Sequence, residues 1–188
     1  MSTLPTGVLV LVVGPSGVGK DTLIEGARKA LEGDGRFSFV RRLVTRPADA
    51  GFEDHVSLEA AEFAAAAAAG RFALSWRAHG LDYALPIGVD TDLALGRVVI
   101  ANISRHAVGA ALARYPRCRI VEISAEISLR AERLARRGRE DRDQIAARLA
   151  REGAILPEGV APLVIDNSSS AAAGIAAFAM ALRAIAGE

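Results

Sequence analysis

Residues 8–13, VLVLVV, followed by residues 14–22, GPSGVGKDT, decide the fold of this chain. Six consecutive apolar residues, four of them valines, predict a strand that is buried on both faces, as in a parallel sheet. Glycine and proline then turn the chain, and apolar residues recur at helical spacing over residues 23–31. A strand, a glycine-rich turn and a helix in this order are the context in which G-x-x-x-x-G-K indicates a phosphate-binding loop.

The chemistry of this loop suits a polyphosphate. Glycines allow consecutive backbone N–H groups to point at one centre, and the helix N-terminus adds partial positive charge. Lys20 is expected to reach the β- and γ-phosphates and to be catalytic. The alternative is an ordinary strand–helix turn that happens to hold glycines, but only Lys20 and Lys29 among 23 basic residues are lysines. The predicted ATP-binding residues are Gly14, Pro15, Ser16, Gly17, Val18, Gly19, Lys20, Asp21 and Thr22.

Asp21 stands where a Ser or Thr usually follows the lysine and binds Mg²⁺ through its hydroxyl. A carboxylate is also a good ligand for a hard cation, directly or through water. We therefore predict Asp21 as a metal ligand and Mg²⁺ as a cofactor. The alternative is that Asp21 only favours the positive end of the helix.

The whole chain has the properties of one globular domain, residues 1–188, with 51% hydrophobic and 24% charged residues. A net charge of +1 gives no reason to expect nucleic-acid binding. The single cysteine, Cys118, excludes an internal disulfide and fits a reducing cytoplasm. Residues 8–13 are too few to span a bilayer and lack the flanks of a secretory signal. We expect a cytoplasmic protein without membrane contact.

Strand and helix patterns alternate along the chain, which predicts an α/β fold with a parallel sheet and right-handed crossovers. A segment at 41–47 is expected to be extended, and residues 48–55 and 78–83 are expected to be a loop and a turn. Further strands are predicted at 37–40, 72–76, 98–101, 119–123 and 163–167, and helices at 58–69, 91–95, 106–115 and 171–185.

Two groups of arginines have both a structural and a functional interpretation. Arg41, Arg42 and Arg46 form either a solvated strand end or a site for a second phosphorylated molecule. Eight arginines between residues 130 and 151 form either a solvated helical pair or a lid that closes over transferring phosphates. Polar residues from Asn102 to Arg105 follow the strand at 98–101, at the edge where such sheets bind ligands.

With these segments placed, the chain resembles the guanylate-kinase group of P-loop kinases over nearly its whole length. The resemblance implies a P-loop NTPase fold with a helical lid at about 130–151 and an acceptor-binding region at about 37–90. Four motifs carry it: residues 14–20, GPSGVGK; residues 45–47, TRP; residues 72–83, from Phe72 to Tyr83; and residues 133–139, RLARRGR.

Several departures from guanylate kinases lie where guanine is read. Ser75 replaces a base-reading Glu and Arg42 replaces a Ser, while Asn102 and Ser104 stand in place of two aspartates. Together with Asp21, this set resembles the ribose 1,5-bisphosphate phosphokinase family. That family transfers phosphate from ATP to ribose 1,5-bisphosphate, giving 5-phosphoribosyl 1-diphosphate, in phosphonate breakdown and diphosphate supply.

The resemblance also implies the remaining site residues and the partners. A phosphorylated sugar would be the acceptor, and the chain would be a monomer or a homodimer. Two alternatives stay open: a guanylate or other nucleoside monophosphate kinase, and a non-catalytic binding module of the same fold. The implied substrate-binding residues are Arg42, Arg46, Ser75, Tyr83, Asn102 and Ser104, and the implied catalytic residues beside Lys20 are Arg133, Arg137 and Arg148.

Overall fold

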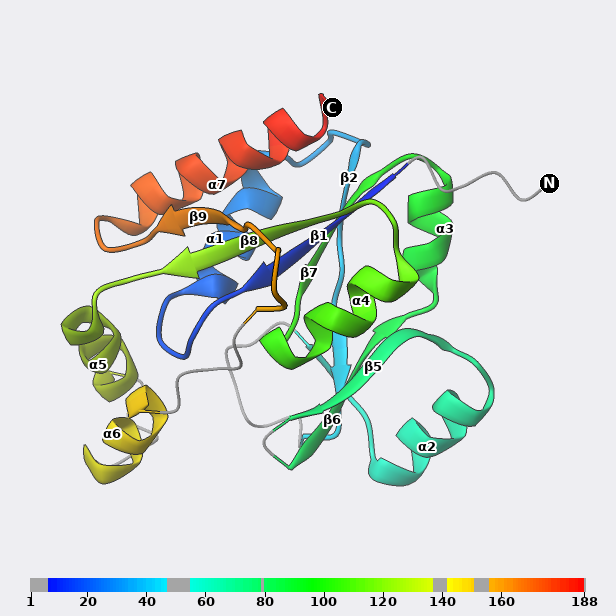
Figure 1. Ribbon diagram of the computed structural model, residues 1–188, viewed down its shortest axis with the longest axis horizontal. Coiled ribbons are helices and arrows are strands. Elements are labelled where there is room, and N and C mark those ends of the chain that lie inside the picture. The colour runs from blue at the N-terminus through cyan, green and yellow to red at the C-terminus, as the bar shows by residue number, and fades with distance from the viewer. Residues whose placement is uncertain (1–6, 47–54, 79, 137–141, 151–155, 188) are drawn as a thin grey trace.

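Two sheets and seven α-helices make up the part of the chain that the structure describes (Figure 1). The structure is a computed structural model, and for residues 142, 148 and 150 it describes the backbone alone. No helix among these residues is both long and apolar enough to cross a membrane. The described ranges are 7–46, 55–78, 80–136, 142–150 and 156–187.

The central sheet is fully parallel and has the strand order β2-β7-β1-β8-β9. This arrangement confirms the predicted parallel sheet, and each of its strands overlaps a segment predicted from the sequence. Val12 lies opposite Asn102 on β7, so the end of β7 is level with the start of the phosphate-binding loop. The strands are β1 (Val8–Val13), β2 (Phe37–Phe39), β7 (Val98–Asn102), β8 (Cys118–Ser124) and β9 (Leu163–Asp166).

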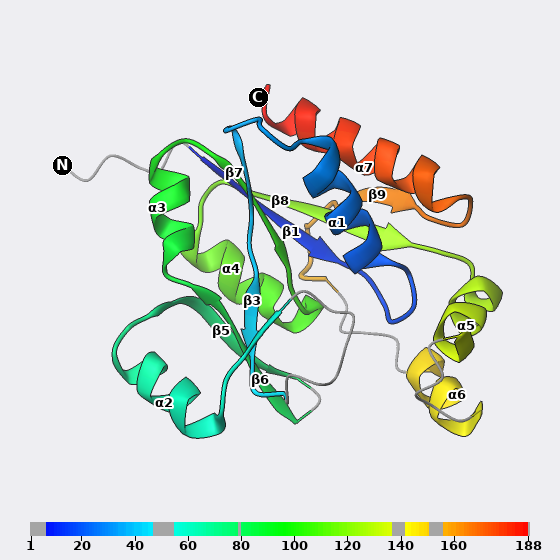
Figure 2. The same ribbon diagram turned by 180° about the vertical axis from the view of Figure 1, so that it is seen from behind.

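Helices cover both faces of this sheet because β1 is apolar on both sides. Val8, Val10 and Val12 belong to a core with α1 (Lys20–Ala30) and α7 (Ala171–Ile185). The alternate residues of β1 belong to a second core with α3 (Gly88–Ala94) and α4 (Val108–Arg114). Figures 1 and 2 show α1 and α7 on one side of the sheet and α3 and α4 on the other.

A second, mixed sheet of order β4-β3-β6-β5 lies beside the first and was not predicted. With α2 it occupies residues 42–86, inside the region expected to bind the acceptor. The turn expected at 78–83 is present but shorter: Gly80 has a φ of 77° between β5 and β6, and residues 81–83, which were expected in the turn, belong to β6. The expected loop is wrong at His55, which starts β4, and its other residues, 48–54, lie outside the described ranges. The elements are β3 (Arg42–Val44), β4 (His55–Ser57), α2 (Ala60–Ala68), β5 (Phe72–Ala78) and β6 (Leu81–Pro86).

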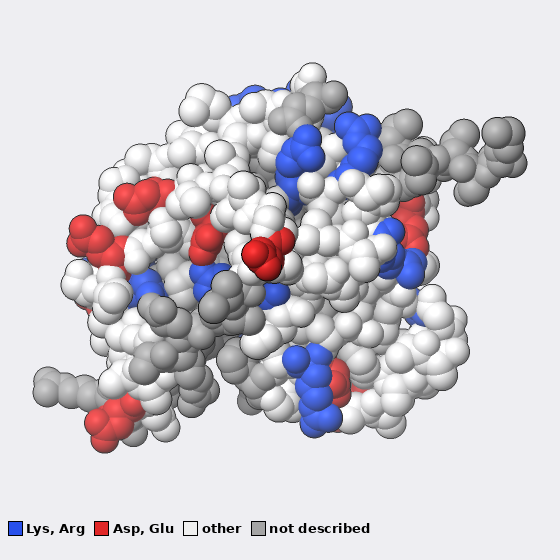
Figure 3. All heavy atoms as spheres, in the orientation of Figure 1, with Lys and Arg blue, Asp and Glu red and all other residues white. Residues whose placement is uncertain are grey.

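Two helices project from the carboxyl edge of the central sheet, where a lid was predicted (Figure 1). They are α5 (Ile127–Arg136) and α6 (Arg142–Ala150). A short 3₁₀ turn, η1 (Arg105–Ala107), separates β7 from α4. On the face shown in Figure 3, basic and acidic side chains of the described residues form small groups with uncharged surface between them.

Candidate active site

The phosphate-binding loop leads from β1 into α1 and depends on glycine for its path. Gly17 and Gly19 have φ of 83° and 90°, in the left-handed region that side chains other than glycine rarely adopt. A Cβ on Gly19 would also lie 2.6 Å from Nδ2 of Asn167. The first helical N–H groups of α1 have no partner within the helix, so the loop ends in an anion site.

Lys20, the first residue of α1, folds back over this loop. Its Nζ donates to the carbonyl oxygen of Gly14 at 2.6 Å and to that of Pro15 at 3.2 Å. Charge-assisted bonds to phosphate oxygens are stronger than bonds to neutral carbonyls, so a polyphosphate can draw the ammonium away from them. Thr22, two residues further along α1, is exposed.

Two side chains that are distant in sequence, Arg130 and Asn167, donate hydrogen bonds to backbone carbonyls of the loop. Arg130, which is only 5% exposed, donates through Nε to the Ser16 carbonyl at 3.0 Å. Asn167, 2% exposed, donates through Nδ2 to the Val18 carbonyl at 2.7 Å. Arg130 was predicted only as one of the eight arginines of a possible lid, and Asn167 was not predicted as a site residue; the available signal for Asn167 was its position directly after a strand of the sheet.

Arg133 shares this supporting position in the structure. It donates through Nη1 to the Val18 carbonyl at 3.3 Å and through Nη2 to the Asn167 carbonyl at 2.9 Å. Its predicted catalytic contact with phosphate stays a prediction. Arg137 lies outside the described residues, and Arg148 is described only as part of the α6 backbone.

Replacing Gly174 with alanine is expected to lower the free energy of unfolding by about 1–3 kcal/mol. Gly174 lies in α7, and a Cβ there would overlap Oδ1 of Asn167, so the helix or the asparagine must move. Displacing Asn167 from Val18 should also weaken ATP binding. Urea denaturation and calorimetric titration measure the two effects.

Gly109→Ala in α4 is the matched control, because nothing lies within 4 Å of the added Cβ. It should be stabilised by about 0.5–1 kcal/mol through higher helix propensity. A Gly174→Ala protein as stable as the wild type would contradict the assigned contact.

Asp21 lies in the first turn of α1 and meets the end of the neighbouring strand. Nδ2 of Asn102 donates to its Oδ1 at 2.8 Å. Oδ1 of Asn102 is buried and accepts no hydrogen bond within the described part of the chain. A carboxylate beside an amide oxygen is the donor chemistry that suits Mg²⁺, so these residues fit the predicted cation.

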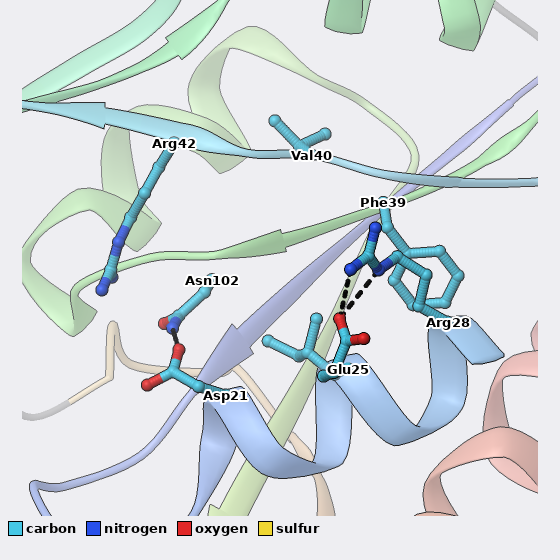
Figure 4. Close-up of a pocket in the computed structure, with 8 residues that line it drawn as sticks. Asp21, Glu25, Arg28, Phe39, Val40, Arg42 and Asn102 are labelled. Carbon is cyan, nitrogen blue, oxygen red and sulfur yellow. Dashed lines mark hydrogen bonds and ion pairs between the residues drawn. The ribbon is translucent and has the colours of Figure 1, made fainter. Parts of the chain in front are cut away.

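One pocket joins these two residues to the predicted acceptor region (Figure 4). Arg42 lies at the start of β3 and points into the space beside Asn102 and Asp21 (Figure 4). The other walls of the pocket come from α1, from the end of β2 and from Val40, the residue that follows β2. The lining residues are Asp21, Ile24, Glu25, Arg28, Phe39, Val40, Arg42 and Asn102.

A second carboxylate in this pocket is already held by a cation. Arg28 donates to Oε2 of Glu25 through Nε at 2.9 Å and through Nη2 at 2.5 Å (Figure 4). This hydrogen bond lowers the pKa of Glu25. Glu25 therefore stays ionised, and its carboxylate is already paired with Arg28 of the same helix.

Arg42 is placed by an aromatic stack on the second sheet. Its guanidinium carbon lies 5.6 Å from the centroid of the Tyr83 ring, and Tyr83 stacks on Trp76 with centroids 5.5 Å apart. Ser75 pairs with Ala84 and Trp76 with Tyr83, so Ser75 leaves the sheet on the opposite face. The structure thus brings Arg42 and Tyr83 together but not Ser75.

The other two predicted acceptor residues, Arg46 and Ser104, each lie two residues after the end of a strand, β3 and β7 respectively. Arg46 is half-buried and follows Thr45, whose hydroxyl accepts a hydrogen bond from the Asp82 N–H at 2.9 Å. Ser104 is the N-cap of η1, where Oγ accepts from the His106 N–H at 3.4 Å. Substrate contact stays a prediction for all six residues: Arg42, Arg46, Ser75, Tyr83, Asn102 and Ser104.

The fold and the loop define the class of the protein: an α/β P-loop protein with a guanylate-kinase-like architecture. A crystal structure of guanylate kinase from Anaplasma phagocytophilum aligns with a TM-score of 0.68 at 16% identity, over 96% of this chain and 87% of that one. At that identity the likeness concerns the fold alone.

Sequence comparison identifies the family within this class, although no family model matches the chain. Ribose 1,5-bisphosphate phosphokinase PhnN of Brucella abortus is 51% identical over 182 residues, covering 97% of this chain and 95% of the relative. The protein of the same name from Methylobacterium radiotolerans is 51% identical over 178 residues, covering 95% and 98%. The chain belongs to the ribose 1,5-bisphosphate phosphokinase family.

A two-enzyme relative contains the same unit. The bifunctional ribose 1,5-bisphosphokinase-thymidine phosphorylase of Azorhizobium caulinodans is 50% identical over 182 residues, covering 97% of this chain and 26% of that longer protein.

Proposed function

We propose that this protein transfers the γ-phosphoryl group of ATP to ribose 1,5-bisphosphate and releases ADP and 5-phosphoribosyl 1-diphosphate. The observation that carries the proposal is that one pocket contains both the end of the phosphate-binding loop and the predicted acceptor region. It begins at Asp21, one residue after the phosphate-loop lysine, and also contains Arg42, a cation placed for an anionic acceptor. The names of the relatives supply the identity of that acceptor.

The bond changes are simple. An oxygen of the acceptor's 1-phosphate forms a bond to the γ-phosphorus of ATP, and the bond between that phosphorus and the β–γ bridging oxygen breaks. The attacking oxygen needs no general base, because the second pKa of a phosphomonoester is about 6 and the group is ionised near neutral pH. The obstacle is repulsion between two anions, so the site must position them and screen their charge.

Residues of this chain supply both effects. Lys20 binds the transferring phosphate, Asp21 holds Mg²⁺, and Arg42 and Arg46 hold the acceptor. Mg²⁺, when bound with ATP, neutralises charge on the phosphates. We assign acceptor binding to residues 37–90. We assign residues 130–151, which include Arg137 and Arg148, to a lid that closes over the transferring phosphates. A cytoplasmic location, with its supply of ATP, fits this activity.

The test is direct identification of the product. Purified protein is incubated with ATP, Mg²⁺ and ribose 1,5-bisphosphate, and phosphorus NMR follows the appearance of a diphosphate on carbon 1 with equimolar ADP. ADP release without the sugar diphosphate would contradict the acceptor assignment. ATP binding without any transfer would favour the non-catalytic alternative.

A further inference from the structure

The contact between Asp21 and Asn102 joins the head of α1 to the end of β7. Asn102 is the last residue of β7 and is 9% exposed, so its side-chain amide is largely shielded from solvent. Its Nδ2 donates to Oδ1 of Asp21 at 2.8 Å (Figure 4). The other carboxylate oxygen of Asp21, Oδ2, accepts no hydrogen bond from any residue in the described ranges.

The amide of Asn102 is only half satisfied by this contact. Its Oδ1 is buried in the pocket wall and has no donor within the described residues. A buried acceptor without a donor costs free energy, and a simple clamp between helix and strand would need only the N–H group. The unpaired oxygen therefore points to a ligand that arrives with the substrates.

We infer that Asn102 is a positioning residue for the cation that accompanies ATP. Its N–H group fixes one oxygen of Asp21 and leaves the other for the cation, while its own Oδ1 accepts a hydrogen bond from a water of the cation. Mg²⁺ keeps several waters when it binds proteins, and residues that orient its ligands typically change metal affinity 10–100-fold when mutated. This inference rests on the proposed use of ATP, and it moves Asn102 from the acceptor to the cation.

The test measures cation binding without catalysis. Mn²⁺ serves as the probe and is titrated by electron paramagnetic resonance into protein saturated with ADP, with no acceptor present. Asn102→Ala should weaken Mn²⁺ binding at least about tenfold, while ADP affinity in EDTA should change less than about twofold, since no cation takes part. The Mg²⁺ concentration for half-maximal transfer should rise with the Mn²⁺ dissociation constant.

Two further variants separate positioning from folding. Glu25→Gln is the matched control, because Glu25 lines the same pocket but is bound by Arg28, and it should leave Mn²⁺ affinity unchanged. Asn102→Asp keeps the size of the side chain and adds a second carboxylate beside Asp21. It should bind Mn²⁺ at least as tightly as the wild type and gain more thermal stability from the cation.

Each outcome bears on the proposal. Unchanged Mn²⁺ affinity in Asn102→Ala, or an equal loss of ADP affinity with and without cation, would overturn it and leave Asn102 a structural clamp. Mn²⁺ binding that depends on Asn102 in a protein unable to phosphorylate ribose 1,5-bisphosphate would support it and overturn only the acceptor. A protein that binds no adenine nucleotide would overturn both.

Discussion

Replacing Lys20 with methionine is expected to lower the rate of phosphoryl transfer at least a hundredfold in a protein that still folds. The loss corresponds to about 3 kcal/mol of transition-state stabilisation. The Lys20 ammonium lies across the phosphate-binding loop, on the carbonyls of Gly14 and Pro15, and its side chain is only half-buried. Methionine keeps the length of the chain and removes the charge that the transferring phosphate would meet.

The only other lysine in the chain provides the control. Lys29 lies on the same helix, its side chain is 74% exposed, and it pairs with Glu25 at 3.4 Å. Lys29→Met should keep turnover within about twofold of wild type, because exposed ion pairs contribute little. Single-turnover rates and circular dichroism of both variants decide the matter. Near-normal turnover in folded Lys20→Met protein would contradict the role of the loop.

Ribose 1,5-bisphosphate is expected to be used at least about a hundredfold better than GMP, measured as kcat/KM. A site built to hydrogen-bond one edge of a base discriminates strongly, since removal of a partner leaves buried polar groups unpaired. Here Ser75 replaces the Glu that the resemblance to guanylate kinases implies for base reading, and it faces away from Arg42 and Tyr83. GMP therefore lacks an orienting contact, whereas a second phosphate can meet Arg42.

Arg42 also supplies the variant that tests the reason for this preference. Arg42→Ala should reduce kcat/KM for ribose 1,5-bisphosphate at least about tenfold, since a charge-assisted contact to phosphate is lost, while ATP affinity stays near wild type. Arg77, whose side chain is 75% exposed on β5, is the control position, and its replacement should have little effect. Equal or better use of GMP by the wild-type protein would return the chain to the guanylate-kinase alternative.

The sequence predicts the central sheet well because its signals are local. The apolar run at 8–13 is β1, and the helix predicted at 171–185 has the same bounds in α7. The second sheet was harder to predict because Leu81–Pro86 has no strand periodicity and becomes β6 only by pairing with β5 and β3.

The candidate site shows the same division between local and distant signals. The loop from Gly14 to Asp21 could be predicted because one contiguous motif contains it. The contacts of Arg130 and Asn167 with this loop could not be predicted, because they reach Ser16 and Val18 across separations of 114 and 149 residues. Their side chains acquire a role only when α5 and β9 reach the back of the loop, which no short pattern encodes.

The stack of Arg42, Tyr83 and Trp76 gives the protein an optical reporter. Trp76 is the single tryptophan of the chain, and its ring lies 5.5 Å from Tyr83, on which the guanidinium of Arg42 rests. Indole emission responds to nearby charges and rings, so an anion that draws Arg42 away from Tyr83 changes the fluorescence of Trp76. If the acceptor binds Arg42 as proposed, its binding should be visible in the fluorescence of the unlabelled protein before any phosphate is transferred.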